Sequence, residues 1–249
     1  MNLKALFNLP KPLKSRVVEG PKMGDQLIRD MWLLRLEYLK LTTSKELDWQ
    51  KFRDLCVREN TLLITFHDEC DCLQGYFTFF FKPVDHEGRK ALLVHSKYYY
   101  VRPDYRGHPK ITSVAWRLLP GMIRRYGFRQ IYFVAFSFPT SYVSLTRTFG
   151  HSMPIQCDTT PTWEKSVLEG YAKESVGLDW DSDSKLIVNQ NVPVGEDRPP
   201  SKNVQVLRSA FEAFNPDWEK GRSMPIMMRF DLSMVKSVLG TSLRRLRRS

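Results

Sequence analysis

The sequence predicts an α/β (α+β) protein with a central sheet, helices on its faces and a C-terminal extension. Two segments of helical periodicity open the chain, and three runs rich in β-branched and aromatic residues follow them. A further helical pattern over 111–123 then separates the third run from the apolar run 131–136. Strands that alternate with helices in this order indicate the α/β class.

The two opening helices are predicted from the spacing of apolar side chains. In residues 25–41 these side chains fall three or four positions apart and form one helix face: Ile28, Met31, Trp32, Leu36 and Leu39. Thr43 and Glu46 stand at the spacing of a capping box, which predicts the start of a second helix.

Three antiparallel strands are predicted over 61–68, 73–83 and 91–101, because turn-like segments separate these runs. The helix that follows contains Pro120, which kinks or shortens it. A buried strand over 131–136 then precedes a short helix that begins after Pro139.

The pattern weakens beyond Gly150. A helix is predicted from Thr160 and Pro161, another over 201–214, and a closing strand over 223–230. The segment between the two helices is rich in Pro, Asp and Asn, with a short strand over 185–188.

The charge balance favours an acidic partner or an anionic ligand. Lys and Arg number 38 and Asp and Glu number 27, which gives a formal net charge of +11. Nucleic acid, a phosphate-bearing cofactor, an acidic carrier protein and an anionic membrane surface all fit this charge. No recognisable nucleic-acid motif accompanies it, so we expect no nucleic-acid partner.

The cysteine pattern and the hydropathy indicate a cytoplasmic protein. Four cysteines in 249 residues do not make a disulfide framework, which favours a reducing compartment. No apolar run is long enough for a transmembrane helix, and Pro10 and Pro12 interrupt the N-terminal segment. Residues 67–72 hold His, Asp, Glu and two Cys but lack a second ligand pair, so we expect a polar hairpin turn and no metal.

Residues 101–107 read Val-Arg-Pro-Asp-Tyr-Arg-Gly, directly after the third predicted strand. With the order of elements around it, this motif resembles the GNAT superfamily of N-acyltransferases over residues 24–151. Residues 145–151, Leu-Thr-Arg-Thr-Phe-Gly-His, are a weaker match. The resemblance implies a mixed sheet that splays between the strand ending near Val101 and the strand 131–136, with an acyl donor in the splay.

The implied activity is the transfer of an acyl group, with fatty acyl among the candidates, from a pantetheine thioester to an amine. The amine acceptor could belong to a small molecule, an amino acid or a peptide side chain. The turn after the strand would bind the donor phosphates, through Val101, Arg102, Arg106, Gly107, His108 and Lys110. The catalytic candidates are His95, Tyr98 and Tyr142, and we expect His95 on the opposite strand face from Tyr98 and Tyr100.

The sequence departs from the family pattern at its phosphate-binding turn. The family's Arg-x-x-Gly-x-Gly/Ala has Pro109 and Ile111 in place of its small residues, and proline removes a backbone N–H. Many members carry a tyrosine for the leaving thiolate where this chain has Thr146, one helical turn after Tyr142. Where a strand glutamate often acts as base, this chain has Tyr98.

Two kinds of donor explain the altered turn. An acidic acyl-carrier protein presents pantetheine through a single phosphate, as in the N-acyl amino acid synthases and acyl-homoserine-lactone synthases. The second possibility is acyl-CoA, held by basic side chains in place of the lost amides. A non-catalytic interaction module of the same fold and a basic nucleic-acid-binding protein are the alternative functions.

The predicted organisation is an N-terminal arm over 1–23, a donor-binding core over 24–151 and a C-terminal elaboration over 152–240. This elaboration completes the domain and the acceptor site. A basic tail over 241–249 ends the chain.

Overall fold

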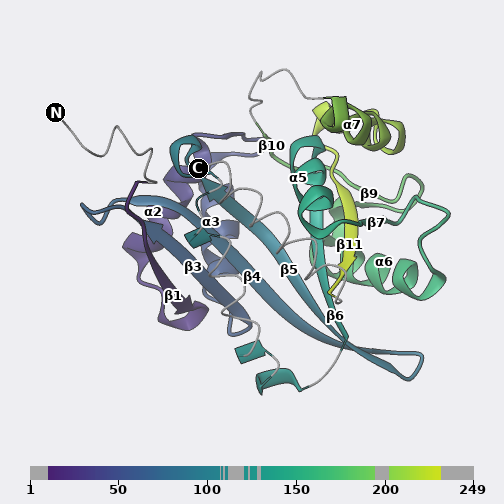
Figure 1. Ribbon diagram of the computed structural model, residues 1–249, viewed down its shortest axis with the longest axis horizontal. Coiled ribbons are helices and arrows are strands. Elements are labelled where there is room, and N and C mark those ends of the chain that lie inside the picture. Colours follow the sequence, from purple (N-terminus) through teal and green to yellow (C-terminus); the bar gives the residue numbers. More distant parts are fainter. Residues whose placement is uncertain are drawn as a thin grey trace.

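The computed structural model describes residues 11–106, 108, 110–111, 121–122, 124–127, 130–193 and 202–230. A seven-stranded sheet forms its centre, in the order β1-β3-β4-β5-β6-β11-β7 (Figure 1). The strands span β1 Lys14–Glu19, β3 Thr61–His67, β4 Leu73–His86, β5 Arg89–Val101, β6 Gln130–Ser137, β7 Met153–Pro154 and β11 Met224–Arg229. Only β5 and β6 are parallel among the neighbouring pairs described. The sheet is therefore mixed, and the predicted fold class is confirmed.

The helices that pack on this sheet are α2 Asp25–Leu36, α3 Lys45–Cys56, α5 Pro139–Phe149, α6 Thr162–Val176 and α7 Lys202–Phe214. The helix predicted over 111–123 lies mostly outside the described residues. Strand β1 falls within the predicted N-terminal arm and forms one edge of the sheet by pairing with β3.

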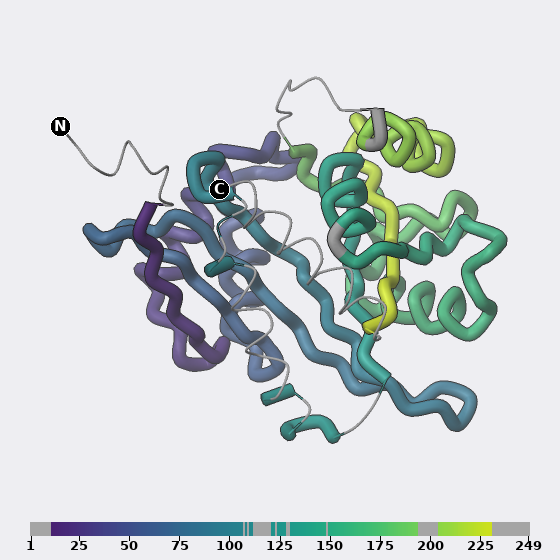
Figure 2. The backbone as a smooth tube through the Cα atoms, in the orientation of Figure 1, coloured from purple at the N-terminus to yellow at the C-terminus, as the bar shows by residue number. Residues whose placement is uncertain are grey.

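Two helix boundaries differ from the sequence prediction. Helix α2 ends at Leu36 rather than near residue 41, because β2 (Leu39–Lys40) pairs instead with β10 (Val192–Pro193). Figure 2 shows this pairing where the purple N-terminal part meets the green C-terminal part of the chain. Ser44, not Thr43, caps α3, since its hydroxyl accepts a hydrogen bond from the Leu47 N–H at 3.3 Å.

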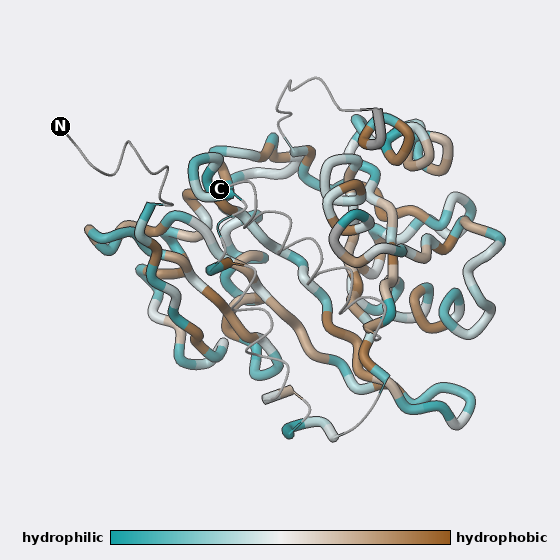
Figure 3. Tube along the Cα trace, viewed as in Figure 1, coloured by the Kyte–Doolittle hydropathy of each residue, from teal (hydrophilic) through white to brown (hydrophobic). Residues whose placement is uncertain are grey.

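The hairpin between β4 and β5 is tighter than predicted. The strands extend to His86 and Arg89, and only Glu87 and Gly88 form the turn. Both turn residues have positive φ, 52° and 72°, as a two-residue turn requires if it is to match the right-handed twist of the two strands. Figure 3 shows hydrophobic residues along the inner strands and a hydrophilic tip at this hairpin.

The two faces of the sheet carry different helices. Residues of α2 and α3 pack around Tyr76 of β4, and residues of α6 pack around Leu93 of β5 and Tyr132 of β6, all on one face. Helices α5 and α7 cover the other face, where they pack against Ala135 of β6. We call the first the α6 face and the second the α5 face. In the part of the chain that is described, no helix is long and apolar enough to cross a membrane.

Candidate functional site

The parallel strands β5 and β6 separate before either of them ends. Their pairing stops at His95 opposite Val134. Beyond this point β5 stays paired with β4 as far as Val101, whereas β6 stays paired with β11 as far as Ser137. Figure 1 shows the two strands side by side at one end and diverging towards α5 at the other. The predicted splay between these strands is confirmed.

A β-bulge in β5 lies just beyond the point of separation. Lys97 and Tyr98 together lie opposite the single residue Thr78 of β4. The Thr78 hydroxyl accepts a hydrogen bond from the Tyr98 N–H and donates one to the Tyr98 carbonyl, both at 3.0 Å. The side chain of Thr78 thus occupies the place of a missing backbone pairing and fixes the bulge.

The bulge changes which side chains of β5 share a face. Phe80 of β4 pairs with His95, and Tyr76 pairs with Tyr100. Because Phe80 and Tyr76 are four residues apart in an unbroken strand, they point to the same face. His95 therefore shares the α6 face with Tyr98 and Tyr100. The prediction that His95 lies on the opposite face is wrong, because the extra residue shifts the alternation.

His95 is a buried neutral histidine at the point of separation. Its side chain is only 2% exposed, and its Nδ1 lies 2.8 Å from the Tyr171 hydroxyl of α6. Burial, with a smaller contribution from the charge of Lys97, holds the pKa of His95 well below its ordinary value. Its Nε2 is buried and has no partner among the described residues. Histidine in this state can accept a hydrogen bond or donate one, but it does not carry charge at neutral pH.

Tyr98 packs between a cation and an aromatic ring. The guanidinium of Arg35 lies 5.0 Å from the centre of the Tyr98 ring, and the Phe52 ring lies 5.1 Å away. Burial raises the pKa of Tyr98 to about 12, so the phenol stays protonated at neutral pH. Arg35 itself is buried in an ion pair with Asp48, which links α2 to α3 behind this tyrosine.

Tyr142 lies on the α5 face and so does not approach His95 or Tyr98. Its side chain is 6% exposed and packs against Phe211 of α7, with ring centres 5.4 Å apart. The three predicted catalytic residues thus form a pair on one face and a single residue on the other.

The turn after β5 is held by its own arginines. The Arg106 Nε donates to the Val101 carbonyl at 2.9 Å, and its guanidinium lies 5.6 Å from the centre of the Tyr38 ring. Arg102 forms an ion pair with Glu37 at 2.6 Å. Gly107 lies outside the described residues.

His108 and Lys110 continue this turn. The Lys110 N–H donates to Nδ1 of His108 at 3.1 Å, so Nε2 carries the proton and donates to the Lys11 carbonyl at 3.0 Å. The N-terminal residue Lys11 is thereby tied to the turn, and it also pairs with Asp104 at 2.6 Å.

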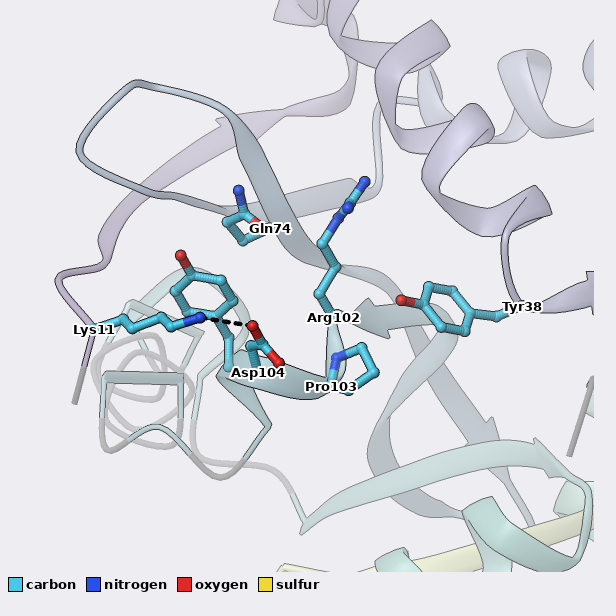
Figure 4. Close-up of a pocket in the computed structure, with 7 residues that line it drawn as sticks. Lys11, Tyr38, Gln74, Arg102, Pro103 and Asp104 are labelled. Carbon is cyan, nitrogen blue, oxygen red and sulfur yellow. Dashed lines mark hydrogen bonds and ion pairs between the residues drawn. The ribbon is translucent and has the colours of Figure 1, made fainter. Parts of the chain in front are cut away.

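A cavity of about 340 Å³ opens beside this turn (Figure 4). It is lined by Lys11, Tyr38, Gln74, Arg102, Pro103, Asp104 and Tyr105. The cations of the lining already have carboxylate partners, Asp104 for Lys11 and Glu37 for Arg102. The cavity therefore has less attraction for a phosphate than its lysine and arginine suggest.

Two residues of β5 that lie beside the split, the gap where β5 and β6 separate, were not singled out by the sequence. Tyr99 comes close to Ser141, which lies in the first turn of α5 on the other side of the gap between β5 and β6. Lys97 occupies the bulge, partly buried, on the α6 face. The run His-Ser-Lys-Tyr-Tyr-Tyr gives no signal of a bulge, so neither position could be assigned from alternation alone.

The predicted polar turn at 67–72 joins β3 to β4. Cys70 and Cys72 are exposed free thiols. Within the described ranges, no three His, Cys, Asp or Glu side chains group closely enough to hold a metal ion.

Comparison with known proteins gives matches to solved structures only. No family model and no curated protein matches the chain. A ribosomal-protein-alanine N-acetyltransferase from Brucella melitensis biovar Abortus matches with 16% identity and a TM-score of 0.38, over 54% of this chain and 88% of that one. An aminoglycoside 6'-N-acetyltransferase from Acinetobacter baumannii matches with 11% identity and a TM-score of 0.41, over 53% of this chain and 86% of that one.

A third match is a probable N-acyltransferase from Enterococcus faecalis, with 17% identity and a TM-score of 0.40, over 57% of this chain and 36% of that one. The matches span about half of this chain.

Proposed function

We propose that the chain is an N-acyltransferase, which moves an acyl group from a pantetheine thioester to an amine. The observation that carries this proposal is the separation of β5 from β6 inside the sheet. Residues 96–101 of β5 have no paired strand on the β6 side within the described chain. Backbone groups at such an edge pair with an extended ligand that carries amides, as an added strand does. Pantetheine is a ligand of this shape.

The donor phosphates would bind at the turn after β5. Arg106 and Lys110 bring cationic side chains to this turn, while Pro109 has no N–H to offer. A carrier protein brings one phosphate to the site and acyl-CoA brings a diphosphate. The net charge of +11 favours the acidic carrier, and the cluster of basic side chains suits either donor.

The acceptor amine would approach from the α6 face. The C-terminal elaboration reaches this side, because β10 pairs with β2 and the Asn191 side chain donates to the Asp48 carboxylate at 2.9 Å. This contact fastens the segment before residue 194 to the α2–α3 pair. Segments from both halves of the chain would thus build the acceptor site.

The proposal is tested by the release of free thiol from acyl-CoA or acyl-carrier protein in the presence of a panel of amines. We expect thiol release that depends on the amine, with the acylated amine identified by mass spectrometry. If the protein neither binds nor turns over any donor, across acyl chains of different length, that result would contradict the proposal.

Arg106→Ala tests the turn. If Arg106 contacts a donor phosphate, loss of this charge-assisted bond of about 1.5 to 3 kcal/mol weakens donor binding roughly tenfold or more. Arg208→Ala on α7 is the matched control, since Arg208 pairs with Glu212 one helical turn away and its guanidinium lies near Trp218. Because Arg106 also bonds the Val101 carbonyl, thermal unfolding is measured for both variants. Unchanged affinity for both donors in a folded Arg106→Ala protein would remove the phosphate role.

A double variant, Pro109→Gly with Ile111→Gly, separates the two donors. The N–H returned at residue 109 and the closer approach that glycine allows at residue 111 should strengthen the binding of acyl-CoA through its diphosphate, whereas a carrier-borne donor with one phosphate should gain little. Equal gains for both donors would show that the turn does not distinguish them.

A further inference from the structure

We propose that Lys97 is the general base of the acyl transfer and accepts the proton that the attacking amine loses. This inference rests on the proposed N-acyltransferase function. It assigns a role that the sequence resemblance left open, since the family's usual strand glutamate is absent.

The position of Lys97 in the fold carries the inference. Lys97 is the first of the two residues in the β5 bulge, and the last residue of β5 that pairs with β6 is His95, two positions earlier. A thioester whose pantetheine arm lies in the split would bring its carbonyl to this point. The bulge therefore places an amine side chain where the acyl group and the acceptor must meet.

The charged neighbours of Lys97 come from α2, from α3 and the segment after it, and from the short helix that follows α6. Arg35 of α2, Lys51 of α3 and Arg58 after α3 repel its positive charge, while Asp179 in η3 (Gly177–Asp179) attracts it. The Lys97 ammonium lies 5.8 Å from the centre of the Tyr98 ring, near the outer limit for a cation–π contact. Burial and the cations prevail and lower the pKa of Lys97 from 10.5 to about 8.

The other titratable groups at this place suit the task less well. Burial keeps His95 neutral, and its Nδ1 is engaged by Tyr171. Burial raises the pKa of Tyr98 to about 12, so its phenol does not accept a proton near neutral pH. A base works best when its pKa lies close to the working pH, and Lys97 meets this condition.

The proton balance of the step is simple. The nitrogen of a neutral acceptor amine attacks the thioester carbonyl carbon, and a C–N bond forms. One N–H proton of the attacking nitrogen passes to the free amine of Lys97. The tetrahedral intermediate then collapses, the C–S bond breaks and the thiolate leaves with the electron pair. Lys97 passes its proton, directly or through water, to the thiolate, so the products are an amide and a thiol.

The test compares Lys97→Met and Lys97→Arg with the wild type, and uses Lys90→Met as the control. Lys90 is an exposed lysine at the far end of the same strand. General-base catalysis contributes about 100-fold or more, so kcat should fall by that factor in both Lys97 variants. Arginine keeps the positive charge but does not lose its proton, so Lys97→Arg should not restore kcat. Donor affinity should change less than about twofold in either variant, since the base does not hold the donor.

Two results would overturn the assignment while the proposed function stands. The first is a Lys97→Arg enzyme that keeps most of its activity, which would mean that only the positive charge matters. The second is a rise of kcat with pH near 8 that persists unchanged in Lys97→Met. A wild type that acylates no amine would overturn both proposals.

A readout without turnover completes the test. Carbon-13 dimethylation of the lysines, with the Lys97 signal assigned by its loss in Lys97→Arg, should give one lysine that titrates near pH 8. Titration of that signal above pH 10 would overturn the inference whatever the activity.

Discussion

Replacement of Lys97 by methionine should make the folded protein more stable at pH 7. The fold holds this ammonium partly buried beside Arg35, Lys51 and Arg58, which lowers its pKa from 10.5 to about 8. A change of that size corresponds to about 3 kcal/mol of unfavourable free energy when the lysine is charged. Because the side chain is only partly buried, we halve this figure for solvent screening to about 1.5 kcal/mol.

The sign of the pH dependence follows from the lowered pKa. Between pH 8 and 10.5 the unfolded chain holds a proton that the folded chain has released, so the wild type gains stability as pH rises through this window. Below pH 8 both states are charged and the cost is fully present. The advantage of Lys97→Met should therefore be largest at pH 7 and should vanish towards pH 10.5.

Thermal and urea unfolding at several pH values measure this difference. At pH 7 a gain of about 1.5 kcal/mol raises the Tm by about 3 to 6 °C in a protein of this size. The exposed Lys90→Met control should change stability by less than about 0.5 kcal/mol. A Lys97→Met protein less stable than the wild type at pH 7, or a difference that does not vary with pH, would refute the reasoning.

Three further predictions concern buried polar groups. Asp48→Asn removes the partner of buried Arg35 and should destabilise the fold by about 3 to 5 kcal/mol, and a urea midpoint within error of the wild type would contradict it. His95 is kept neutral by burial, so stability should fall as pH drops below about 6.5, by up to about 1.4 kcal/mol per pH unit. His95→Phe should weaken this fall between pH 6.5 and 5. If stability falls with the same slope in the variant and the wild type, His95 is not the group responsible. Tyr99→Phe removes a hydroxyl that comes close to Ser141 and should cost about 0.5 to 1.5 kcal/mol in urea unfolding, and no loss would show that the two hydroxyls do not stabilise the fold.

The order and type of the elements could be predicted because their signals are local. The aromatic and β-branched runs of β3, β4 and β5 survive in the structure, as does the helix that begins at Pro139. The end of α2 could not be predicted in the same way. Leu39 continues the helical spacing, yet it pairs with Pro193 from the other end of the chain, and such a long-range contact leaves no local trace.

The candidate site could be predicted only in part, because some of its features are local in the sequence and others depend on two strands together. The strand pair and the basic turn after Val101 are local features, and the sequence located both. The bulge depends on how many residues of β5 stand opposite Thr78, which is a property of two strands together. Its position decides which face His95 lies on and places Lys97 in the bulge, so the sequence misplaced the first and did not single out the second.

The turn after β5 also shows that the charge of a residue does not by itself tell what its side chain contacts. Arg106 has the charge that a phosphate site needs, but its Nε bonds the last carbonyl of β5 and its plane lies near Tyr38. One side chain can serve both purposes, since a guanidinium has five N–H donors and the bond to Val101 uses one. The thermal control on Arg106→Ala is therefore essential to separate binding from folding.

The charge pattern around the bulge explains why a lysine fits where a carboxylate base would not. Beside Arg35, Lys51 and Arg58 a glutamate would hold its charge so strongly that its pKa would fall, and it would become a weaker base. The same cations push a lysine towards its neutral form, which is the form that accepts a proton. A lysine base is therefore consistent with the three cations on the α6 face. Reversing one of these charges, as in Arg58→Glu, should raise the pKa of Lys97 and slow the acyl transfer at neutral pH.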